Sequence, residues 1–557
     1  MANKRLFGSQ VSRSMSVPAA DAQTHHGTPA YKLDSFHALC QLACTGTMHN
    51  TYYAGGGDQL DQMVKLSAEV TTEQLAKLAI YSRQKGLMKD MPAACLLLLS
   101  KRDTNLFHVI FDRVITNGKM MRTFFELLRS GRFGRKALSY SISRAFRNRI
   151  RNAMQAMHEK GSPWLLHASI GNDPSYRDIL RCLHYKPFTN FERAVNGWLA
   201  DYEMKYWAPA TYADLPITLQ ALDAFRKAET EQQQLELMPA LTKVRWDLLS
   251  DAIKGTRVWR AVAMNMAPFA LRMNLNTMAR HKVFDDPDTA QYVADRLKDS
   301  EEVKRGGSFP YSYFMAYISL DSSVPQVIKS ALHKAAELSC GNVPTLPGPV
   351  VIGIDTSGSM SSPATGNRGS ATTKATCVQV ASVFGAALLR QNPDSVLVPF
   401  DTCEHQHNLD PNDSILSIAD RLSKYGGGGT DCSVPLGVAN GRLRERPFAG
   451  CIIVSDNESW YNAQSYYRGT TTANAWSRFV DNQKRLRKFP QPKYVGINIQ
   501  PYTIAQNKES TDIMNIGGFS DGVFETVSAF FEDDINRFVR AVESVELYKP
   551  QLDNEEQ

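Results

Sequence analysis

The chain has 557 residues, of which 43% are hydrophobic and 21% are charged, and these proportions exclude a largely disordered protein. No segment approaches the roughly 18 consecutive apolar residues of a transmembrane helix, and the N-terminus lacks the apolar stretch of a secretory signal peptide. The nine cysteines are scattered and form no C-x-x-C pair. This usage is typical of buried thiols rather than of a disulfide or zinc framework, and it predicts a cytoplasmic protein.

The net charge of +7 is divided unevenly along the chain. Residues 1–350 contain 44 Lys and Arg against 32 Asp and Glu, whereas residues 351–557 contain 19 against 24. A basic part followed by an acidic part indicates two domains with different partners. The basic part is the candidate for binding a polyanion.

Residues 1–33 are polar and predict a flexible N-terminal arm. From 34 to 340, apolar residues recur at three- and four-residue spacing, as in 106–115, 123–130 and 178–185. Breakers containing Pro or Gly separate predicted helices of about 10–15 residues. So long a run of helices fits stacked helix pairs, as in HEAT-type solenoids, better than one simple bundle.

Residues 341–349 are rich in Pro and Gly and predict a linker. A domain of different character follows at 350–545, and an acidic tail is expected at 546–557. Helical stretches in this domain alternate with short apolar runs, which predicts a parallel sheet covered on both faces. The predicted strands are 350–355, 395–401, 451–456 and 494–499, and the predicted helices include 378–390 and 414–425.

Polar side chains follow several of these strands, where the loops of a parallel sheet bind ligands. Asp355, Ser357 and Ser359 form a D-x-S-x-S motif directly after the first strand. Thr430 follows four glycines, and Asp456 ends the third predicted strand. These oxygen ligands suit Mg²⁺ or Mn²⁺ and also allow Ca²⁺. The alternative is a capped turn without metal, but three convergent loops favour the metal site.

The surroundings of this motif favour a metal that organises the domain or recruits a partner over one that catalyses a reaction. The motif has no neighbouring histidine to activate water, since His405 and His407 follow a different strand. The sequence also shows no second acidic cluster for a two-metal site. We therefore expect no enzymatic activity.

Residues 129–152 contain eight basic residues, seven of them Arg, and no acidic residue. Arginine binds phosphate through a bidentate fork, and the interleaved Phe133, Tyr140 and Phe146 are candidates for stacking on unpaired bases. The alternative is an ordinary solvated helix face, although such a face usually mixes both signs of charge. The candidates for polyanion contact are Arg129, Arg132, Arg135, Lys136, Arg144, Arg147 and Arg151, the last three spaced to share one helix face.

A second tract without acidic residues covers residues 254–283 and carries six basic residues. Its cations are equally consistent with contact to a polyanion and with a structural role at helix C-termini.

Several longer strings resemble a known family. The metal motif, GGTDCSVPL (428–436) and IIVSDNESW (452–460) resemble the von Willebrand factor A domain of the Ro autoantigen family. The N-terminal part resembles the TROVE domain that members of that family join to it, in segments 50–55, 83–86, 134–137, 183–187 and 258–261.

This resemblance covers about residues 34–545. It implies an all-α ring of HEAT-like helical repeats, the TROVE domain, followed by an α/β, Rossmann-like von Willebrand factor A domain. It also implies that Asp355, Ser357, Ser359, Thr430 and Asp456 form a metal-ion-dependent adhesion site. Such sites commonly leave one metal position open for a carboxylate of a partner.

The resemblance further implies an RNA-binding protein of small-RNA ribonucleoproteins and RNA quality control. Its RNAs would be Y-type small RNAs and the single-stranded 3′ ends of misfolded noncoding RNAs, and a 3′ exoribonuclease such as polynucleotide phosphorylase would be a partner. We expect a monomer. The family's use of the segment around 183–187 adds Arg177, Arg181, His184 and Lys186 to the RNA-binding candidates.

Two other functions stay open on the sequence alone. One is a protein-interaction scaffold that works through the metal site of the A domain. The other is a metal-dependent nuclease. A gel shift with a structured RNA bearing a 3′ tail separates the three functions. An RNA-binding protein binds the RNA and leaves it intact, a scaffold does not bind it at moderate salt, and a nuclease shortens it in the presence of Mg²⁺.

Overall fold

The computed structural model describes residues 17–46, 48–51, 55–133, 138–170, 173–200, 212–306, 310–343, 345–364, 375–459, 471–518, 521–532 and 538–548. The chain divides into two compact units. The first, called the sheet unit below, comprises residues 1–59 and 342–541, and the second, the helical unit, comprises residues 60–341 and 542–557. None of the helices in the described ranges is long and apolar enough to cross a bilayer.

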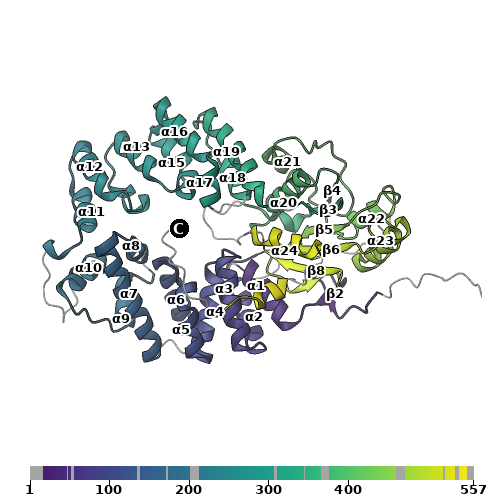
Figure 1. Cartoon of the computed structure of the whole chain (residues 1–557), viewed down its shortest axis with the longest axis horizontal. Helices are drawn as coiled ribbons and strands as arrows, with labels where there is room; N and C mark the ends of the chain where they lie inside the picture. Colours follow the sequence, from purple (N-terminus) through teal and green to yellow (C-terminus); the bar gives the residue numbers. More distant parts are fainter. Residues whose placement is uncertain are drawn as a thin grey trace, which may run out of the picture. The chain divides into compact units, whose positions relative to one another are not determined.

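The helical unit consists of a succession of short helices, which Figure 1 shows following one another in chain order. The helices are α2 (Gly56–Ala68), α3 (Thr72–Gln84), α4 (Asp90–Arg102), α5 (Thr104–Val114), α6 (Gly118–Ser130), α7 (Tyr140–Lys160), α8 (Trp164–Ser169), α9 (Tyr176–Cys182), α10 (Asn190–Ala200), α11 (Ile217–Lys227), α12 (Glu231–Leu237), α13 (Thr256–Asn265), α14 (Pro268–Met273), α15 (Leu275–Arg280), α16 (Pro287–Leu297), α17 (Ser300–Gly306), α18 (Pro310–Ile318) and α19 (Gln326–Ser339).

Each of these helices packs mainly against helices close to it in sequence. Helix α4 contacts α3, α5 and α6, and α16 contacts α13 and α19. The prediction of an N-terminal part built from helices is confirmed, and the segments predicted as helical at 106–115 and 123–130 coincide with α5 and α6.

Helix α7, the longest helix described, has clear signals at both ends. The Ser139 side chain accepts a hydrogen bond from the Ile142 N–H, which satisfies one of the unpaired donors of the first turn. Gly161 ends the helix with a φ of 65°, in the left-handed region that glycine adopts without strain. Buried side chains follow a spacing of three and four along one face, and the basic side chains of α7 therefore lie on the other faces.

An aromatic cluster holds α5, α6 and α7 together. The Phe146 ring of α7 lies 4.8 Å from Phe111, 4.9 Å from Phe124 and 5.0 Å from Phe125, measured between ring centroids. Phe146 and Phe133 are both buried, so the expectation that they stack on bases is wrong. Apolar rings at helical spacing fill the core here because burial of aromatic surface is the stronger driving force.

The sheet unit contains five parallel strands in the order β4-β3-β5-β6-β8. The strands are β3 (Val350–Asp355), β4 (Val396–Phe400), β5 (Gly450–Ser455), β6 (Lys493–Asn498) and β8 (Ile513–Gly517). Four of them match the predicted strands within one or two residues, whereas the sequence analysis missed β8. Strand β3 lies between β4 and β5, so connections leave it in both directions and open a crevice at the carboxyl ends of the strands.

Helices cover both faces of this sheet, as Figure 1 shows. Helix α20 packs on β3, and its Phe384 ring stacks on Phe524 of α24 at 4.7 Å. Helices α22 and α23 cover the opposite face and share a hydrophobic core with the strands. The helices are α20 (Cys377–Gln391), α21 (Ile415–Leu422), α22 (Val434–Asn440), α23 (Thr472–Leu486), α24 (Asp521–Phe531) and α25 (Phe538–Glu543). The predicted α/β fold is confirmed.

The N-terminal segment packs within the sheet unit. Strand β1 (Ala22–Gln23) pairs with β2 (Pro29–Lys32), and β2 pairs with β7 (Ile504–Ala505), in a small antiparallel sheet. The prediction of a flexible arm is therefore wrong for residues 22–32. The β7 partner of β2 lies more than 470 residues away in the sequence, and a local pattern cannot reveal it.

Helix α1 (Ser35–Thr45) also belongs to the sheet unit. It packs against β8, and His37 Nε2 lies 2.8 Å from the carbonyl oxygen of Asn515. Burial lowers the pKa of His37. The sequence predicted a helical domain beginning at residue 34, whereas the compact helical unit begins at residue 60.

All nine cysteines are free. Seven are buried, as the sequence predicts for structural thiols, but Cys182 and Cys403 are exposed. Exposure makes these two thiols available for chemistry that the buried ones cannot perform.

We predict that Phe146→Ala destabilises the helical unit by about 3–5 kcal/mol, because it removes a ring that three helices share and leaves a cavity. Tyr140→Ala on the same helix is the control, since that side chain is 76% exposed and should change the stability by about 0.5 kcal/mol or less. Thermal unfolding followed by circular dichroism measures both variants. Equal melting temperatures for the two variants would contradict the assignment of Phe146 to the core.

Candidate metal centre and polyanion surface

Three loops at the carboxyl edge of the sheet hold the predicted metal ligands. Asp355 ends β3, Ser357 and Ser359 lie at the 3₁₀ turn that follows, and Asp456 comes directly after β5. Strands β3 and β5 are neighbours, which places the two acidic residues at adjacent strand ends. The fifth candidate, Thr430, lies in the loop between α21 and α22, and all five residues are buried.

The glycine-rich loop is tied to the D-x-S-x-S turn through the backbone. The Gly427 N–H donates to the Thr356 carbonyl at 2.8 Å, and the Gly358 N–H donates to the Gly428 carbonyl at 2.8 Å. Gly426 has a φ of 79°, and a Cβ there would lie 2.3 Å from the Thr356 carbonyl oxygen. A side chain at this position would therefore separate the loop that carries Thr430 from the turn that carries the serines.

Hydrogen bonds orient the oxygen atoms of the site. Asp355 Oδ1 accepts from the Ser357 N–H at 2.9 Å, and Asp355 Oδ2 accepts from the Ser455 hydroxyl at 2.6 Å. The Ser357 and Ser359 hydroxyl oxygens lie 3.2 Å apart. The sequence analysis missed Ser455, although its place beside Asp456 at the end of a buried strand was a usable signal.

Electrostatics at this site favour a bound cation. Burial, and then repulsion from Asp456, raise the pKa of Asp355 to about 7. Burial also raises the pKa of Asp456, against the opposing effect of a hydrogen bond from Ser359. Two buried carboxylates so close together are stable in the charged form only when a positive charge compensates them.

The donor set fits a hard divalent ion. It offers two carboxylates together with the hydroxyls of Ser357 and Ser359, all oxygen ligands of the type that Mg²⁺ and Mn²⁺ prefer. The structure brings these four residues together, and the backbone of the glycine-rich loop brings Thr430 to the same edge of the sheet.

The basic residues of α7 differ in their surroundings. Arg144 is exposed, and Arg147 lies over the ring of the exposed Tyr140, with 5.2 Å between the guanidinium carbon and the ring centroid. Among the described residues, neither arginine forms an ion pair with a carboxylate. Both keep their positive charge available to solvent on the outer part of the helix.

Other arginines of the predicted surface are paired with carboxylates. Arg129 Nη1 lies 2.9 Å from Asp173 Oδ1, and Arg132 Nη1 lies 3.2 Å from Asp61 Oδ1. These pairs are half-exposed, so their own stabilisation is small and a phosphate could compete for the arginine. Asp173 and Asp61 make the net charge of this surface less positive than a count of residues 129–152 suggests.

Arg151 joins α7 to the segment that follows α9. Its Nη2 donates to the Lys186 carbonyl at 3.3 Å, its Nε lies 3.7 Å from Glu192 Oε1, and its guanidinium carbon lies 4.0 Å from the centroid of the exposed Phe188. The exposed His184, with a φ of 48°, lies in the same segment. Two groups of predicted RNA-binding residues, far apart in the sequence, thus meet on one surface.

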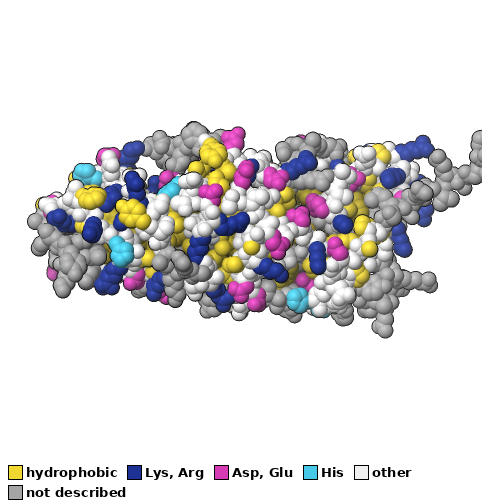
Figure 2. All heavy atoms as spheres, turned by 90° about the horizontal axis from the view of Figure 1, so that it is seen from below, with side chains coloured by type: hydrophobic (Ala, Val, Ile, Leu, Met, Phe, Trp, Pro, Cys, Tyr) yellow, Lys and Arg dark blue, Asp and Glu magenta, His cyan; other side chains and the backbone are white. Residues whose placement is uncertain are grey.

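The remaining predicted RNA-binding residues fall into three groups: one has a structural partner, two are exposed, and two lie outside the described residues. Arg177 donates to the Ala200 carbonyl at 3.1 Å, whereas Arg181 and Lys186 are exposed. Arg135 and Lys136 fall outside the described residues. In Figure 2, basic and apolar side chains are mixed over the end of the molecule where α7 and α9 lie.

Two cations of the second basic tract, residues 254–283, have structural partners. Arg272 is buried, with its guanidinium carbon 4.7 Å from the Tyr313 ring centroid, and Arg260 Nη1 lies 3.6 Å from Asp286 Oδ2. The structure therefore gives Arg272 and Arg260 the structural role, one of the two alternatives for this tract.

The fold and the carboxyl-edge cluster define the class of protein: a helical domain joined to a von Willebrand factor A domain. Residues 350–531 match the family model described as the Ro60 vWA domain. The chain is 25% identical over 406 residues to the RNA-binding protein RO60 of Deinococcus radiodurans, covering 68% of this chain and 69% of the relative.

A solved structure is similar over nearly the whole chain. The crystal structure of the Deinococcus radiodurans RO (RSR) protein matches with a TM-score of 0.61 and 20% identity, covering 90% of this chain and all of that one. At 20% identity this structural match supports the fold alone. The resemblance to the Ro family, with its A domain of the Ro60 type, is confirmed.

We predict that Asp355→Asn abolishes stabilisation by Mg²⁺. A ligand that binds only the folded protein at 100 times its dissociation constant stabilises it by about 2.7 kcal/mol, so the wild type should melt at a higher temperature with Mg²⁺ than with chelator. Scanning calorimetry at pH 8 measures this shift in the wild type, in Asp355→Asn, and in the control Asp420→Asn, whose carboxylate forms a surface pair with Lys424. The same Mg²⁺-induced shift in Asp355→Asn would refute the assignment of Asp355 as a ligand.

Proposed function

We propose that this chain is a non-enzymatic RNA-binding protein of the Ro type. The observation that carries the proposal is the surface formed by α7 and the segment after α9, where Arg147 and Arg151 lie beside the exposed rings of Tyr140 and Phe188. Arg144 and Arg147 have no carboxylate partner among the residues that the structure describes. The relative from Deinococcus radiodurans is named an RNA-binding protein, which supports the same function.

The chemistry of this surface suits RNA with unpaired nucleotides. Arg144 and Arg147 supply charge for phosphates, and Tyr140 and Phe188 are 76% and 71% exposed, so the face of each ring opposite its arginine is available for stacking. Stacking contacts need unpaired bases, whereas phosphate contacts tolerate any sequence. A surface with both kinds of contact favours loops and single-stranded ends over regular duplex.

Within this function we propose two classes of RNA. The first is a small structured RNA of the Y type, and the second is misfolded noncoding RNA bound through a single-stranded 3′ end. We further propose that the chain acts as a cytoplasmic monomer and cooperates with a 3′ exoribonuclease such as polynucleotide phosphorylase. These roles follow from the resemblance to the Ro family and from the basic surface.

For the A domain we propose a bound Mg²⁺ or Mn²⁺ that organises the three loops and offers a site to a protein partner. The ligands proposed are Asp355, Ser357, Ser359, Thr430 and Asp456. Buried carboxylates with raised pKa values support a metal at this place. A protein-interaction scaffold without RNA remains the competing function, and the following experiment separates the two.

We predict that Arg144→Glu with Arg147→Glu weakens binding of a structured RNA with a single-stranded 3′ tail by on the order of tenfold or more. The dependence of log affinity on log salt concentration should become shallower by about two, since each phosphate contact contributes about one to the slope. Filter binding at several salt concentrations measures both quantities.

The matched control is Arg444→Glu with Arg485→Glu, which reverses two half-exposed arginines in the sheet unit. This control should bind RNA like the wild type. Equal loss in both double variants would show nonspecific electrostatics, and no loss in Arg144→Glu with Arg147→Glu would remove α7 from the interface. No binding by the wild type at moderate salt would favour the scaffold, and Mg²⁺-dependent shortening of the RNA would reveal a nuclease.

A further inference from the structure

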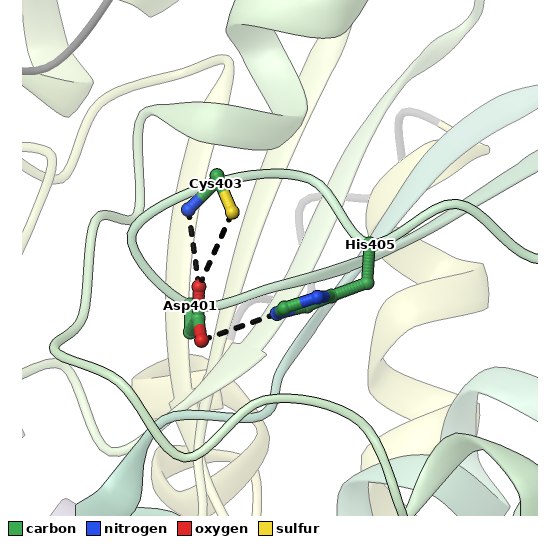
Figure 3. A group of neighbouring side chains, drawn as sticks. All are labelled: Asp401, Cys403 and His405. Atoms are coloured by element: carbon green, nitrogen blue, oxygen red, sulfur yellow. Dashed lines mark hydrogen bonds and ion pairs between the residues drawn. The ribbon is translucent and has the colours of Figure 1, made fainter.

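The loop after β4 brings together three side chains of types that bind transition metals. Asp401 follows β4 directly, and Cys403 and His405 come two and four residues later. One ligand atom from each residue lies within 4.8 Å of the other two. Figure 3 shows the Cys403 sulfur and the His405 ring both turned toward the Asp401 carboxylate.

We propose that Asp401, Cys403 and His405 form a binding site for a zinc-like transition-metal ion, separate from the oxygen-ligand site at Asp355. The proposed ligand atoms are a carboxylate oxygen, the cysteine sulfur and the Nε2 atom of the imidazole. Nitrogen and sulfur ligands select Zn²⁺ and similar ions over Mg²⁺ and Ca²⁺.

The distances between the ligand atoms fit tetrahedral zinc. His405 Nε2 lies 3.1 Å from Asp401 Oδ2, and Cys403 Sγ lies 3.7 Å from Asp401 Oδ1. Zinc–ligand bonds of about 2.0–2.3 Å at tetrahedral angles place nitrogen about 3.4 Å from oxygen and sulfur about 3.6 Å from oxygen. The two distances run to different oxygens of the Asp401 carboxylate, and the sulfur and the ring nitrogen lie within 4.8 Å of each other, so rotations of these side chains would bring the three ligand atoms around one ion.

The imidazole of His405 provides an independent indication. Its Nε2 atom is buried and lies 3.1 Å from Asp401 Oδ2. The ring lies near Tyr425, with centroids 5.9 Å apart and planes 23° from parallel. A buried ring nitrogen that already faces a carboxylate is placed to share a metal ion with it.

The carboxylate of Asp401 is also held in place. Its Oδ1 accepts from the Cys403 N–H at 3.1 Å, and its Oδ2 accepts from the Gly428 N–H at 3.2 Å. Such surrounding hydrogen bonds orient a ligating carboxylate. They also link this loop to the glycine-rich loop that carries Thr430.

Charge and exposure allow an ion to enter. A carboxylate, a thiolate and a neutral imidazole together carry two negative charges, which a divalent ion balances, and the thiol proton leaves to solvent on binding. Cys403 is exposed, so an ion can reach the site and a water molecule can complete the coordination.

Nearby side chains are engaged elsewhere, which limits the proposed set to three residues. Glu404 forms an ion pair with Arg442, and His407 Nε2 lies 2.8 Å from the Leu397 carbonyl oxygen. The resulting D-x-C-x-H pattern contains no C-x-x-C pair, and a search of the sequence for cysteine pairs does not find it.

Cobalt titration of the full-length, metal-free protein tests the proposal, because a thiolate bound to Co²⁺ gives a charge-transfer band and tetrahedral Co²⁺ gives strong visible bands. We expect both bands to saturate at one ion per chain, to disappear on addition of Zn²⁺, and to persist in excess Mg²⁺. This result needs no variant. The absence of a thiolate band in the wild type would overturn the proposal.

Variants assign the band to the proposed residues. Cys403→Ser should remove the charge-transfer band, and His405→Gln should weaken Co²⁺ binding by more than roughly tenfold. Cys182→Ser, which alters the other exposed cysteine, should leave the band unchanged. A band that survives Cys403→Ser would overturn the assignment, and so would a band lost in Asp355→Asn but kept in Cys403→Ser.

Discussion

The main constraint on the sheet unit is that two carboxylates lie close together at the ends of adjacent parallel strands. Asp355 and Asp456 are both buried, and they lie at the ends of the neighbouring strands β3 and β5. Burial and mutual repulsion raise the pKa of Asp355 to about 7. The divalent cation that we propose would convert this repulsion into attraction, and the serine turn and the glycine-rich loop lie at the same edge of the sheet.

Much of this site could be predicted from the sequence, because its determinants are local. Continuous β-branched runs identify buried parallel strands, and D-x-S-x-S directly after such a run places three oxygen ligands at a known edge of the sheet. Strand β8 was missed, since its short segment contains Asn515 and ends in Gly517, with a second glycine next. Ser455 was missed although its place at the end of a buried strand was a usable signal, and its hydrogen bond to Asp355 on the neighbouring strand became visible only in the structure.

Contacts between residues far apart in the sequence limited the prediction of other parts of the fold. The residues of β1 and β2 are polar enough to suggest an arm, whereas β2 pairs with the distant β7 and the turn between β1 and β2 donates hydrogen bonds to Glu458 and Ser459. In the helical unit, the sequence identifies the helices and the charge of α7, but it cannot show which arginines have carboxylate partners. Arg129 is paired with Asp173, whereas Arg144 has no carboxylate partner within the described ranges, and the acid-free tract that contains both gives no sign of this difference. The RNA-binding hypothesis therefore depends on fewer residues than the composition suggests.

The most direct test of the metal centre is the number of protons released when Mn²⁺ binds, measured by calorimetry in buffers of different ionisation enthalpy. Burial raises the pKa of both Asp355 and Asp456, and the metal needs both carboxylates, so binding at pH 6 must displace a proton that the pair holds. The account predicts proton release on binding at pH 6, less release at pH 8, and weaker affinity at the lower pH. Binding of Mn²⁺ with no proton release and equal affinity at pH 6 and pH 8 would contradict it.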